Sequence, residues 1–288
     1  MLLPLLNAAL YAGLAVAIGA VVARFLLLPR CGLSVSERAP PLRLAATAGA
    51  FAAAAVLCAA PARIALQLSM LSEPGEPWSP MLRVILVDTG LGKAMQLQAI
   101  WASAALMAFT VARSGRDRGW KAATVATLIL AVTPGLAGHP AAAARPSLAV
   151  IIATLHVIAA GAWVGTLFHL WRSVRSVSEA TVGAMLRAFH PVALGSAGLL
   201  AATGAYQAWT ALGGPDDLIG SAWGRLLLAK LCVVAVIGAL GHRHWKTSGA
   251  RLASGDRAAV AASFGRELLF AALVIALTAV LASSAPPA

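Results

Sequence analysis

Long apolar runs separated by short polar breaks dominate the pattern of this chain. Each run is close to the about 20 residues that a helix needs to cross the hydrocarbon core of a membrane. The pattern therefore predicts an all-α fold, a polytopic membrane bundle of about eight transmembrane helices. The predicted spans are 4–28, 44–68, 93–112, 121–138, 147–171, 190–212, 222–242 and 267–284.

The composition leads to the same class of protein. Apolar residues make up 60% of the 288 residues and charged residues only 11%. So few charges could not cover the surface of a soluble domain. The chain also lacks the alternating pattern of a transmembrane β-barrel. We therefore expect residues 1–288 to form a single transmembrane domain.

Basic residues are unevenly divided between the two sides that these spans define. Of the 22 lysines and arginines, 16 lie in or beside the loops after the first, third, fifth and seventh spans. An excess of Lys and Arg marks cytoplasmic loops. We therefore expect these four loops in the cytoplasm and both termini outside. The 16 residues are Arg24, Arg30, Arg38, Arg43, Arg113, Arg116, Arg118, Lys121, Arg172, Arg175, Arg187, Arg243, Lys246, Arg251, Arg257 and Arg266.

The net charge of +12 would indicate a polyanion as partner if the protein were soluble. Here the excess is spread over four loops on one membrane face, where it sets the topology and contacts anionic lipid. We therefore expect the lipid bilayer as a partner and no nucleic acid.

His156 is the histidine predicted to lie nearest the middle of the membrane, roughly 13 Å into its span at about 1.5 Å per residue. An imidazole at that depth is costly unless it is paired or faces a cavity, so His156 is a functional candidate. The alternative is a structural histidine that bonds to a Ser, a Thr or a carbonyl of a neighbouring helix.

The residues that follow His156 have a helical spacing. His156, Ala160 and Trp163 are related as i, i+4 and i+7, so we expect them to share one face. Small residues around Gly161 and Gly165 are expected to let another helix approach closely.

The stretch from His156 to Gly165 resembles the His-x6-Trp-x-Gly signature of the bacterial copper-resistance D (CopD) inner-membrane proteins. Further motifs of that family have counterparts in the same order over residues 88–287. They are Asp88-Thr89-Gly90-Leu91-Gly92, Gly138-His139, Trp223-Gly224-Arg225-Leu226-Leu227-Leu228-Ala229-Lys230 and Glu267-Leu268.

The resemblance implies copper handling at the bacterial cytoplasmic (inner) membrane, usually as uptake alongside a periplasmic copper-binding protein. Copper accepts imidazole, and copper(I) also accepts Met sulfur. His139 and His156 are therefore candidate metal ligands of an outer entry site, and we expect them to face one cavity. Three methionines near the outer ends of the second and third spans, Met70, Met81 and Met95, are further candidates.

Charged residues near the outer side have two interpretations. Arg225 and Lys230 in the seventh span either extend to the headgroups or pair with Asp88 or Asp216. Pairing would close the outer mouth of the bundle.

Two other functions compete with copper transport. One is a haem-binding electron-transfer protein with bis-His ligation, for which His190 with His242 is the best pair. The other is a structural scaffold, in which His139 and His156 are dispensable. The sequence shows no paired carboxylates, no Ser–His pair and no nucleotide loop, so we expect no enzymatic activity.

Overall fold

The computed structural model describes residues 2–72, 75 and 77–287. Helices account for 89% of the structure, and the described residues contain no strand, so the predicted all-α class is confirmed. Within this part of the chain, eight helical segments are long and apolar enough to cross a membrane. Their bounds are α1 Leu2–Val22 with η1 Ala23–Leu27 and η2 Leu28–Cys31; α2 Val35–Leu71; α4 Gly90–Arg113; α5 Asp117–Ala137; α6 Pro146–Ala160 with η5 Gly161–Gly165 and α7 Thr166–Ser173; α8 Glu179–Ala211; α10 Ala222–Ala253; and α11 Arg257–Ser283. Four short elements lie between them, α3 Trp78–Arg83, η3 Val84–Asp88, η4 His139–Ala142 and α9 Asp217–Gly220.

Each predicted span coincides with one of these eight segments, but several helices continue well beyond their apolar part. The helix α2 begins at Val35, because Ser34 and Glu37 form a capping box there. The two side chains satisfy backbone N–H groups that would otherwise be unpaired. Hydropathy locates the part of a helix that lies in lipid, whereas the caps decide where the helix begins.

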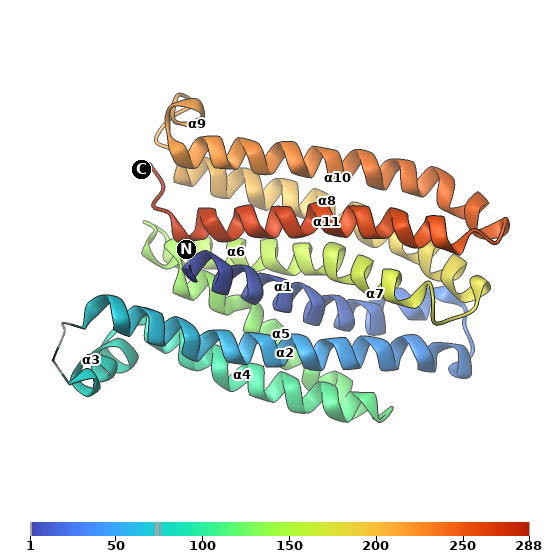
Figure 1. Cartoon of the computed structure of the whole chain (residues 1–288), viewed down its shortest axis with the longest axis horizontal. Helices are drawn as coiled ribbons and strands as arrows, with labels where there is room; N and C mark the ends of the chain where they lie inside the picture. Colours follow the sequence, from blue (N-terminus) through green and yellow to red (C-terminus); the bar gives the residue numbers. More distant parts are fainter. Residues whose placement is uncertain (1, 73–74, 76, 288) are drawn as a thin grey trace.

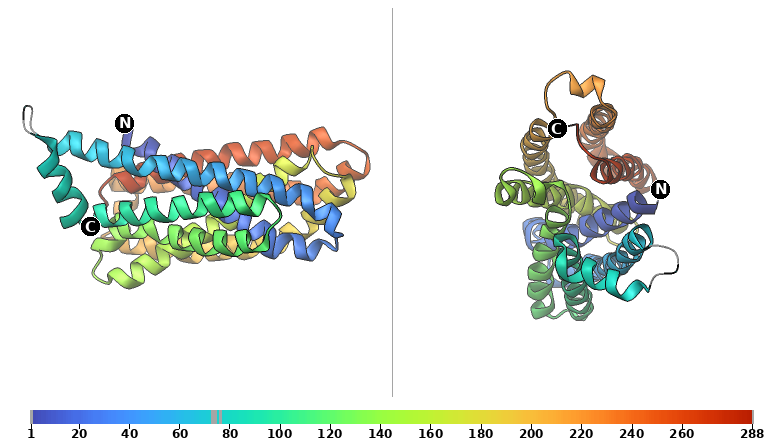
Figure 2. Two further views of the ribbon diagram at one scale, coloured as in Figure 1. Left: turned by 90° about the horizontal axis from the view of Figure 1, so that it is seen from below. Right: turned by 90° about the vertical axis from the view of Figure 1, so that its left-hand side faces the viewer.

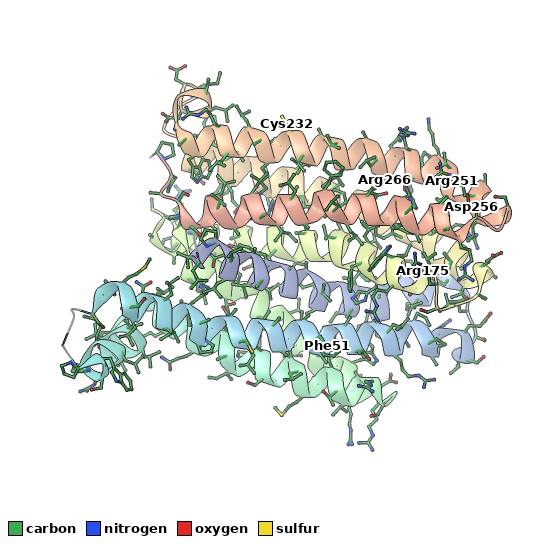
Figure 3. All side chains as sticks on the ribbon, viewed as in Figure 1. Phe51, Arg175, Cys232, Arg251, Asp256 and Arg266 are labelled. Carbon is green, nitrogen blue, oxygen red and sulfur yellow. The ribbon has the colours of Figure 1, made fainter. Side chains whose placement is uncertain are left out.

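The long helices lie side by side, and both termini lie at the same end of the bundle (Figure 1). An even number of crossings returns the chain to the side from which it started. Arg175 and Arg251, two of the basic residues used to predict topology, lie toward the opposite end (Figure 3).

The helices fall into two groups when the bundle is viewed from its end (Figure 2). The amino-terminal group consists of α1, α2, α4 and α5, which pack closely on one another. Its core is rich in buried Ala and Leu and contains an edge-to-face pair of Phe109 and Trp120.

The carboxy-terminal group consists of α6, α8, α10 and α11, and it is packed less closely. The helix α8 contacts mainly α6, α10 contacts mainly α11, and α8 and α10 have few contacts with each other. The two groups are joined through α1, which packs on α11 and on η5, and through α5, which packs on α6.

The contact of α1 with η5 is a backbone-to-backbone approach. A Cβ atom on Gly165 would lie 1.8 Å from the carbonyl oxygen of Ala15, and one on Gly161 would lie 2.6 Å from Cβ of Ile18. The predicted close approach of another helix to this stretch is therefore confirmed, and that helix is α1.

Candidate functional site

His156 bonds across the interface between α6 and α8. Its imidazole is half-buried, and Nδ1 lies 2.9 Å from Oγ1 of Thr203. His156 lies ten residues after the start of α6, which corresponds to about 15 Å along the helix. A bond to a threonine of a neighbouring helix is what a structural histidine would also form. A role in binding metal therefore depends on whether the other ring nitrogen, Nε2, is available.

The hydrogen bonds of Thr203 indicate which nitrogen of His156 carries the proton. The Thr203 hydroxyl donates to the carbonyl of Leu199 at 2.6 Å. A hydroxyl has a single proton to donate, so toward His156 it acts as the acceptor and Nδ1–H is the donor. This assignment follows from the bonding network, because hydrogens are not observed directly. Nε2 then carries the lone pair, and it has no hydrogen-bond partner among the described residues.

Two further residues form the surroundings of this imidazole. Gly204 lies against the ring, since a Cβ atom at that position would be 3.4 Å from Cε1 of His156. Lys230 of α10 is half-buried and lies within electrostatic reach of His156. An ammonium group there opposes the entry of a cation unless its charge is compensated.

Trp163 follows His156 in the same continuous helix but lies in the π-helical turn η5. Such turns insert an extra residue into an α-helix and occur frequently at functional sites. The predicted common face of His156 and Trp163 assumed an uninterrupted α-helical period. The wider turn shifts Trp163 from the direction that this period gives.

His139 lies at the end of the bundle that carries the termini. It is exposed, and its Nε2 donates to the carbonyl of Ser284 at 2.9 Å, which ties η4 to the end of α11. Nδ1 of His139 is then the nitrogen with the lone pair. His139 and His156 thus bond to different helices, and that they face one cavity stays a prediction.

The three candidate methionines lie on α2, α3 and α4, whereas His156 lies on α6. Met70 is 68% exposed near the end of α2, and Met81 lies on the short α3. Met95 is buried and lines a pocket between α2 and α4 together with Cys58. His156 instead lies between α6 and α8. That the methionines are copper ligands stays a prediction.

The charged residues of the outer side are not joined in ion pairs in the part of the chain that the structure describes. Arg225 donates to the carbonyls of Ile219 and Gly220 at the end of α9. Asp88 is exposed, and neither Arg225 nor Lys230 has a carboxylate within 4.0 Å among the described residues. Of the two interpretations, pairing with Asp88 or Asp216 has no counterpart among the described residues, where the α9 carbonyls bind the Arg225 guanidinium.

The histidines of the haem alternative surround an indole. The ring of Trp245 stacks on His190 at 4.8 Å between centroids and lies 6.0 Å from the ring of His242. A haem between these two imidazoles would have to displace the Trp245 ring.

Among the described residues, no group of three or more His, Cys, Asp or Glu side chains is placed to hold one metal ion. The arrangement offers single imidazole nitrogens at different depths.

Sequence reasoning missed Thr203 and Gly204 as partners of His156. A polar residue beside a glycine within an apolar span was the available signal. Their relation to His156 depends on how α6 packs on α8, which the sequence does not show. It also missed a buried pair in the other half of the membrane, where Glu267 Oε1 lies 3.5 Å from His244 Nδ1.

Eight helical spans with polar groups in their interior define a multi-pass helical membrane protein. Two family patterns match the chain. "Copper resistance protein D-like, N-terminal domain" matches residues 1–147 and "Copper resistance protein D" matches residues 183–281. The chain belongs to the copper-resistance protein D family.

Membership implies a role in copper resistance or copper handling. No curated protein and no solved structure matches the chain. Residues 148–182, which include His156 and Trp163, lie between the two matched ranges. The evidence for a role of His156 is therefore the geometry described above and the resemblance of its motif.

Proposed function

We propose that this protein carries copper ions across the cytoplasmic membrane inward, with His156 as a ligand along the path and without a chemical step on the ion. The observation that supports the proposal most directly is the orientation of His156. Thr203 accepts from Nδ1–H, so Nε2 is left as a free donor atom inside the membrane. Imidazole nitrogen is a ligand for both oxidation states of copper.

The bond from His156 Nδ1–H to Thr203 gives the imidazole a defined orientation. Metal-binding histidines usually donate their other N–H to a fixed acceptor, which sets the tautomer and the ring direction. Thr203 supplies that acceptor, and its own proton is held by the Leu199 carbonyl. A histidine that only stabilised packing would not need its second nitrogen left without a partner.

His139 is proposed as an earlier station on the same path. It lies at the end of the bundle that carries the termini and keeps Nδ1 available while Nε2 bonds to Ser284. The charge distribution supports placing this end outside the cytoplasm. A periplasmic copper-binding protein, the partner that the family resemblance implies, would then deliver copper at this end.

Copper accumulation tests the proposal. Cells that express the protein should accumulate more copper than cells without it, and His156→Ala should abolish the gain at equal protein amount. The matched control is His242→Ala, which removes an exposed imidazole at the other end of the bundle and should keep the gain. Equal accumulation in the wild type and His156→Ala would remove His156 from the mechanism, and equal accumulation with and without the protein would remove the import function.

A visible absorption spectrum of the purified protein separates the haem alternative from copper transport. A bis-His haem protein would show an intense haem band that His242→Ala or His190→Ala removes. We expect no such band in the wild type. A reporter fused to either terminus should be found outside the cytoplasm.

A further inference from the structure

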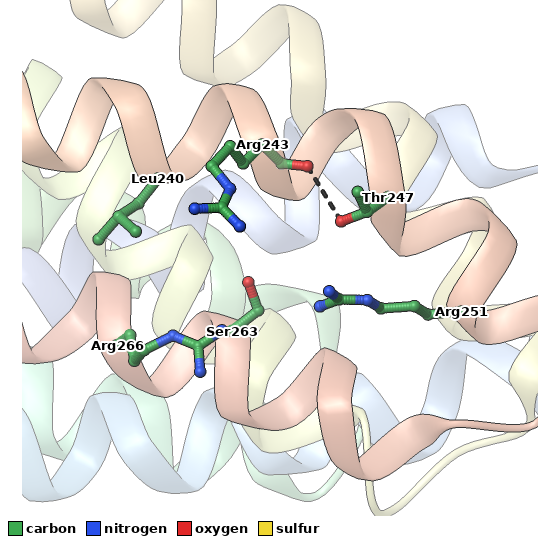
Figure 4. Close-up of a pocket in the computed structure, with 6 residues that line it drawn as sticks. All are labelled: Leu240, Arg243, Thr247, Arg251, Ser263 and Arg266. Carbon is green, nitrogen blue, oxygen red and sulfur yellow. Dashed lines mark hydrogen bonds between the residues drawn. The ribbon is translucent and has the colours of Figure 1, made fainter.

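A polar pocket lies between α10 and α11, away from His156 and toward the end of the bundle opposite the termini (Figures 3 and 4). Its volume is about 270 Å³. Three arginines, one serine, one threonine and one leucine line it. They are Leu240, Arg243, Thr247 and Arg251 of α10, and Ser263 and Arg266 of α11.

The three guanidinium groups turn toward the space beside Ser263 (Figure 4). None of them has a carboxylate within 4.0 Å or a hydrogen-bond acceptor in the part of the chain that the structure describes. Three cations held close together without partners repel one another. An anion between them would remove that repulsion and satisfy the donors.

Neither Asp256 nor Glu267 forms an ion pair with an arginine of the pocket. The Asp256 carboxylate accepts from the backbone N–H of Ala259 and caps the start of α11. Glu267 is buried behind the pocket, 3.5 Å from Nδ1 of His244, and lies within electrostatic reach of Arg266 without an ion pair to it. The other nearby arginine, Arg257, donates to the carbonyls of Val174 and Val177 and so does not enter the pocket. With one carboxylate in reach of three arginines, the pocket keeps a net positive charge.

Ser263 adds a neutral donor to the three cations. Its hydroxyl lies 2.8 Å from Nδ1 of His244, behind the pocket. If Nδ1–H donates to this oxygen, the serine proton is free to point into the pocket. A planar guanidinium fork together with a hydroxyl is the donor set that binds phosphate oxygens well.

The depth of the pocket indicates where the phosphate comes from. From Ala222, the about 20 residues that cross the hydrocarbon end close to Gly241. Counted back from Ser283, the same length of α11 ends close to Phe264. Arg243 and Ser263 thus lie at the boundary between hydrocarbon and headgroups. The exposed apolar surface of α10, such as Leu231, offers acyl chains a place along the helix.

We propose that this pocket binds the phosphate group of an anionic phospholipid, which fastens α10 to α11 at the headgroup level. Phosphate is the shared chemistry of a lipid headgroup and of free inorganic phosphate. The position at the hydrocarbon boundary favours the lipid.

The test compares the full-length wild type with the triple variant Arg243→Gln, Arg251→Gln, Arg266→Gln. Each protein is titrated in detergent with phosphatidylglycerol, with phosphatidylcholine and with inorganic phosphate, and bound lipid is counted by native mass spectrometry. A matched control, Arg113→Gln, Arg116→Gln, Arg118→Gln, removes three exposed arginines between α4 and α5.

The pocket variant should bind phosphatidylglycerol on the order of 100-fold more weakly, because each arginine near the surface contributes about fivefold. The control should change by less than about twofold. No weakening in the pocket variant, or equal weakening in both variants, would overturn the proposal. Inorganic phosphate that competes fully with the lipid at equal concentration would overturn the lipid source and keep the phosphate chemistry.

If the triple variant does not fold, the single variants Arg251→Gln and Arg116→Gln give the same comparison. The affinity for phosphatidylglycerol should fall about fivefold in Arg251→Gln and stay unchanged in Arg116→Gln. Arg251→Lys tests whether the paired N–H donors of the guanidinium matter, because lysine keeps the charge and lacks this planar pair of donors. Full retention of lipid affinity in Arg251→Gln would contradict the proposal.

Discussion

The amino-terminal group and the carboxy-terminal group bury their helices to different extents. In the first span, Leu2–Cys31, 56% of the residues in its apolar stretch are buried inside the protein. In α10 the buried share of the corresponding stretch is 17%. The first group uses Ala and Leu to pack its helices closely. The second group places His156 and Thr203 across the α6–α8 interface, with Lys230 of α10, which has few contacts with α8, in electrostatic reach.

Under the proposed function, this difference separates a scaffold from the region that carries the ion path. Small residues allow helices to approach closely in a membrane, where dispersion contacts hold the helices together. Polar residues between loosely packed helices leave room for ions and lipid headgroups. The two family patterns divide the chain along similar lines, over residues 1–147 and 183–281.

The largest expected effect comes from the contact that joins the two groups. Gly165→Ala would place a Cβ atom 1.8 Å from the Ala15 carbonyl oxygen, so α1 and η5 must separate. We expect a loss of about 3 kcal/mol or more, measured as a collapse of the thermal unfolding temperature in detergent. Gly195→Ala is the control, because nothing lies within 4 Å of that Cβ, and it should leave the temperature unchanged or raise it.

The next prediction compares burial in the two groups with the same chemical change. Leu130 in α5 is 0% exposed and Leu231 in α10 is 51% exposed. Leu130→Ala should cost about 2–4 kcal/mol through the cavity that it leaves, and Leu231→Ala less than about 0.5 kcal/mol. Equal losses in thermal stability would show that the two groups are packed alike.

A smaller effect on transport, without a large effect on stability, is expected at Thr203. Thr203→Val keeps the shape and removes the acceptor of the His156 Nδ1–H bond. Copper accumulation should fall about tenfold, as is typical when a metal-binding histidine loses the acceptor of its other N–H group. Thr210→Val, at an exposed position on the same helix, should accumulate copper normally. If Thr203→Val is as active as the wild type, the orientation of His156 does not matter for transport.

The smallest effect is expected at Lys230. Lys230→Gln removes the positive charge that lies within reach of His156, which lowers the barrier for a cation. The initial rate of copper accumulation should rise about threefold. Lys93→Gln, an exposed lysine of α4, serves as the control. A lower rate in Lys230→Gln would mean that the amine assists the passage of copper.

The sequence alone determined the class of protein and the position of every span. This was possible because a crossing helix must be apolar over a fixed length, and because the hydrogen bonds of its backbone are local. The sequence also singled out His156, since an imidazole within an apolar span is costly wherever the helix packs. The resemblance of its motifs indicated the family, which the family patterns confirmed.

Only the tertiary structure decided which groups meet across helices. It paired His156 with Thr203 rather than with His139, placed Met95 between α2 and α4, and bound Arg225 to carbonyls instead of Asp88 or Asp216. It also brought Arg243, Arg251 and Arg266 around one pocket, although in the sequence they were only part of a basic side. Such contacts depend on helix rotation and crossing, which small residues such as Gly19 and Gly165 set through packing. The hydrophobic pattern fixes how long a helix lies in lipid, but it does not fix which neighbour each face meets.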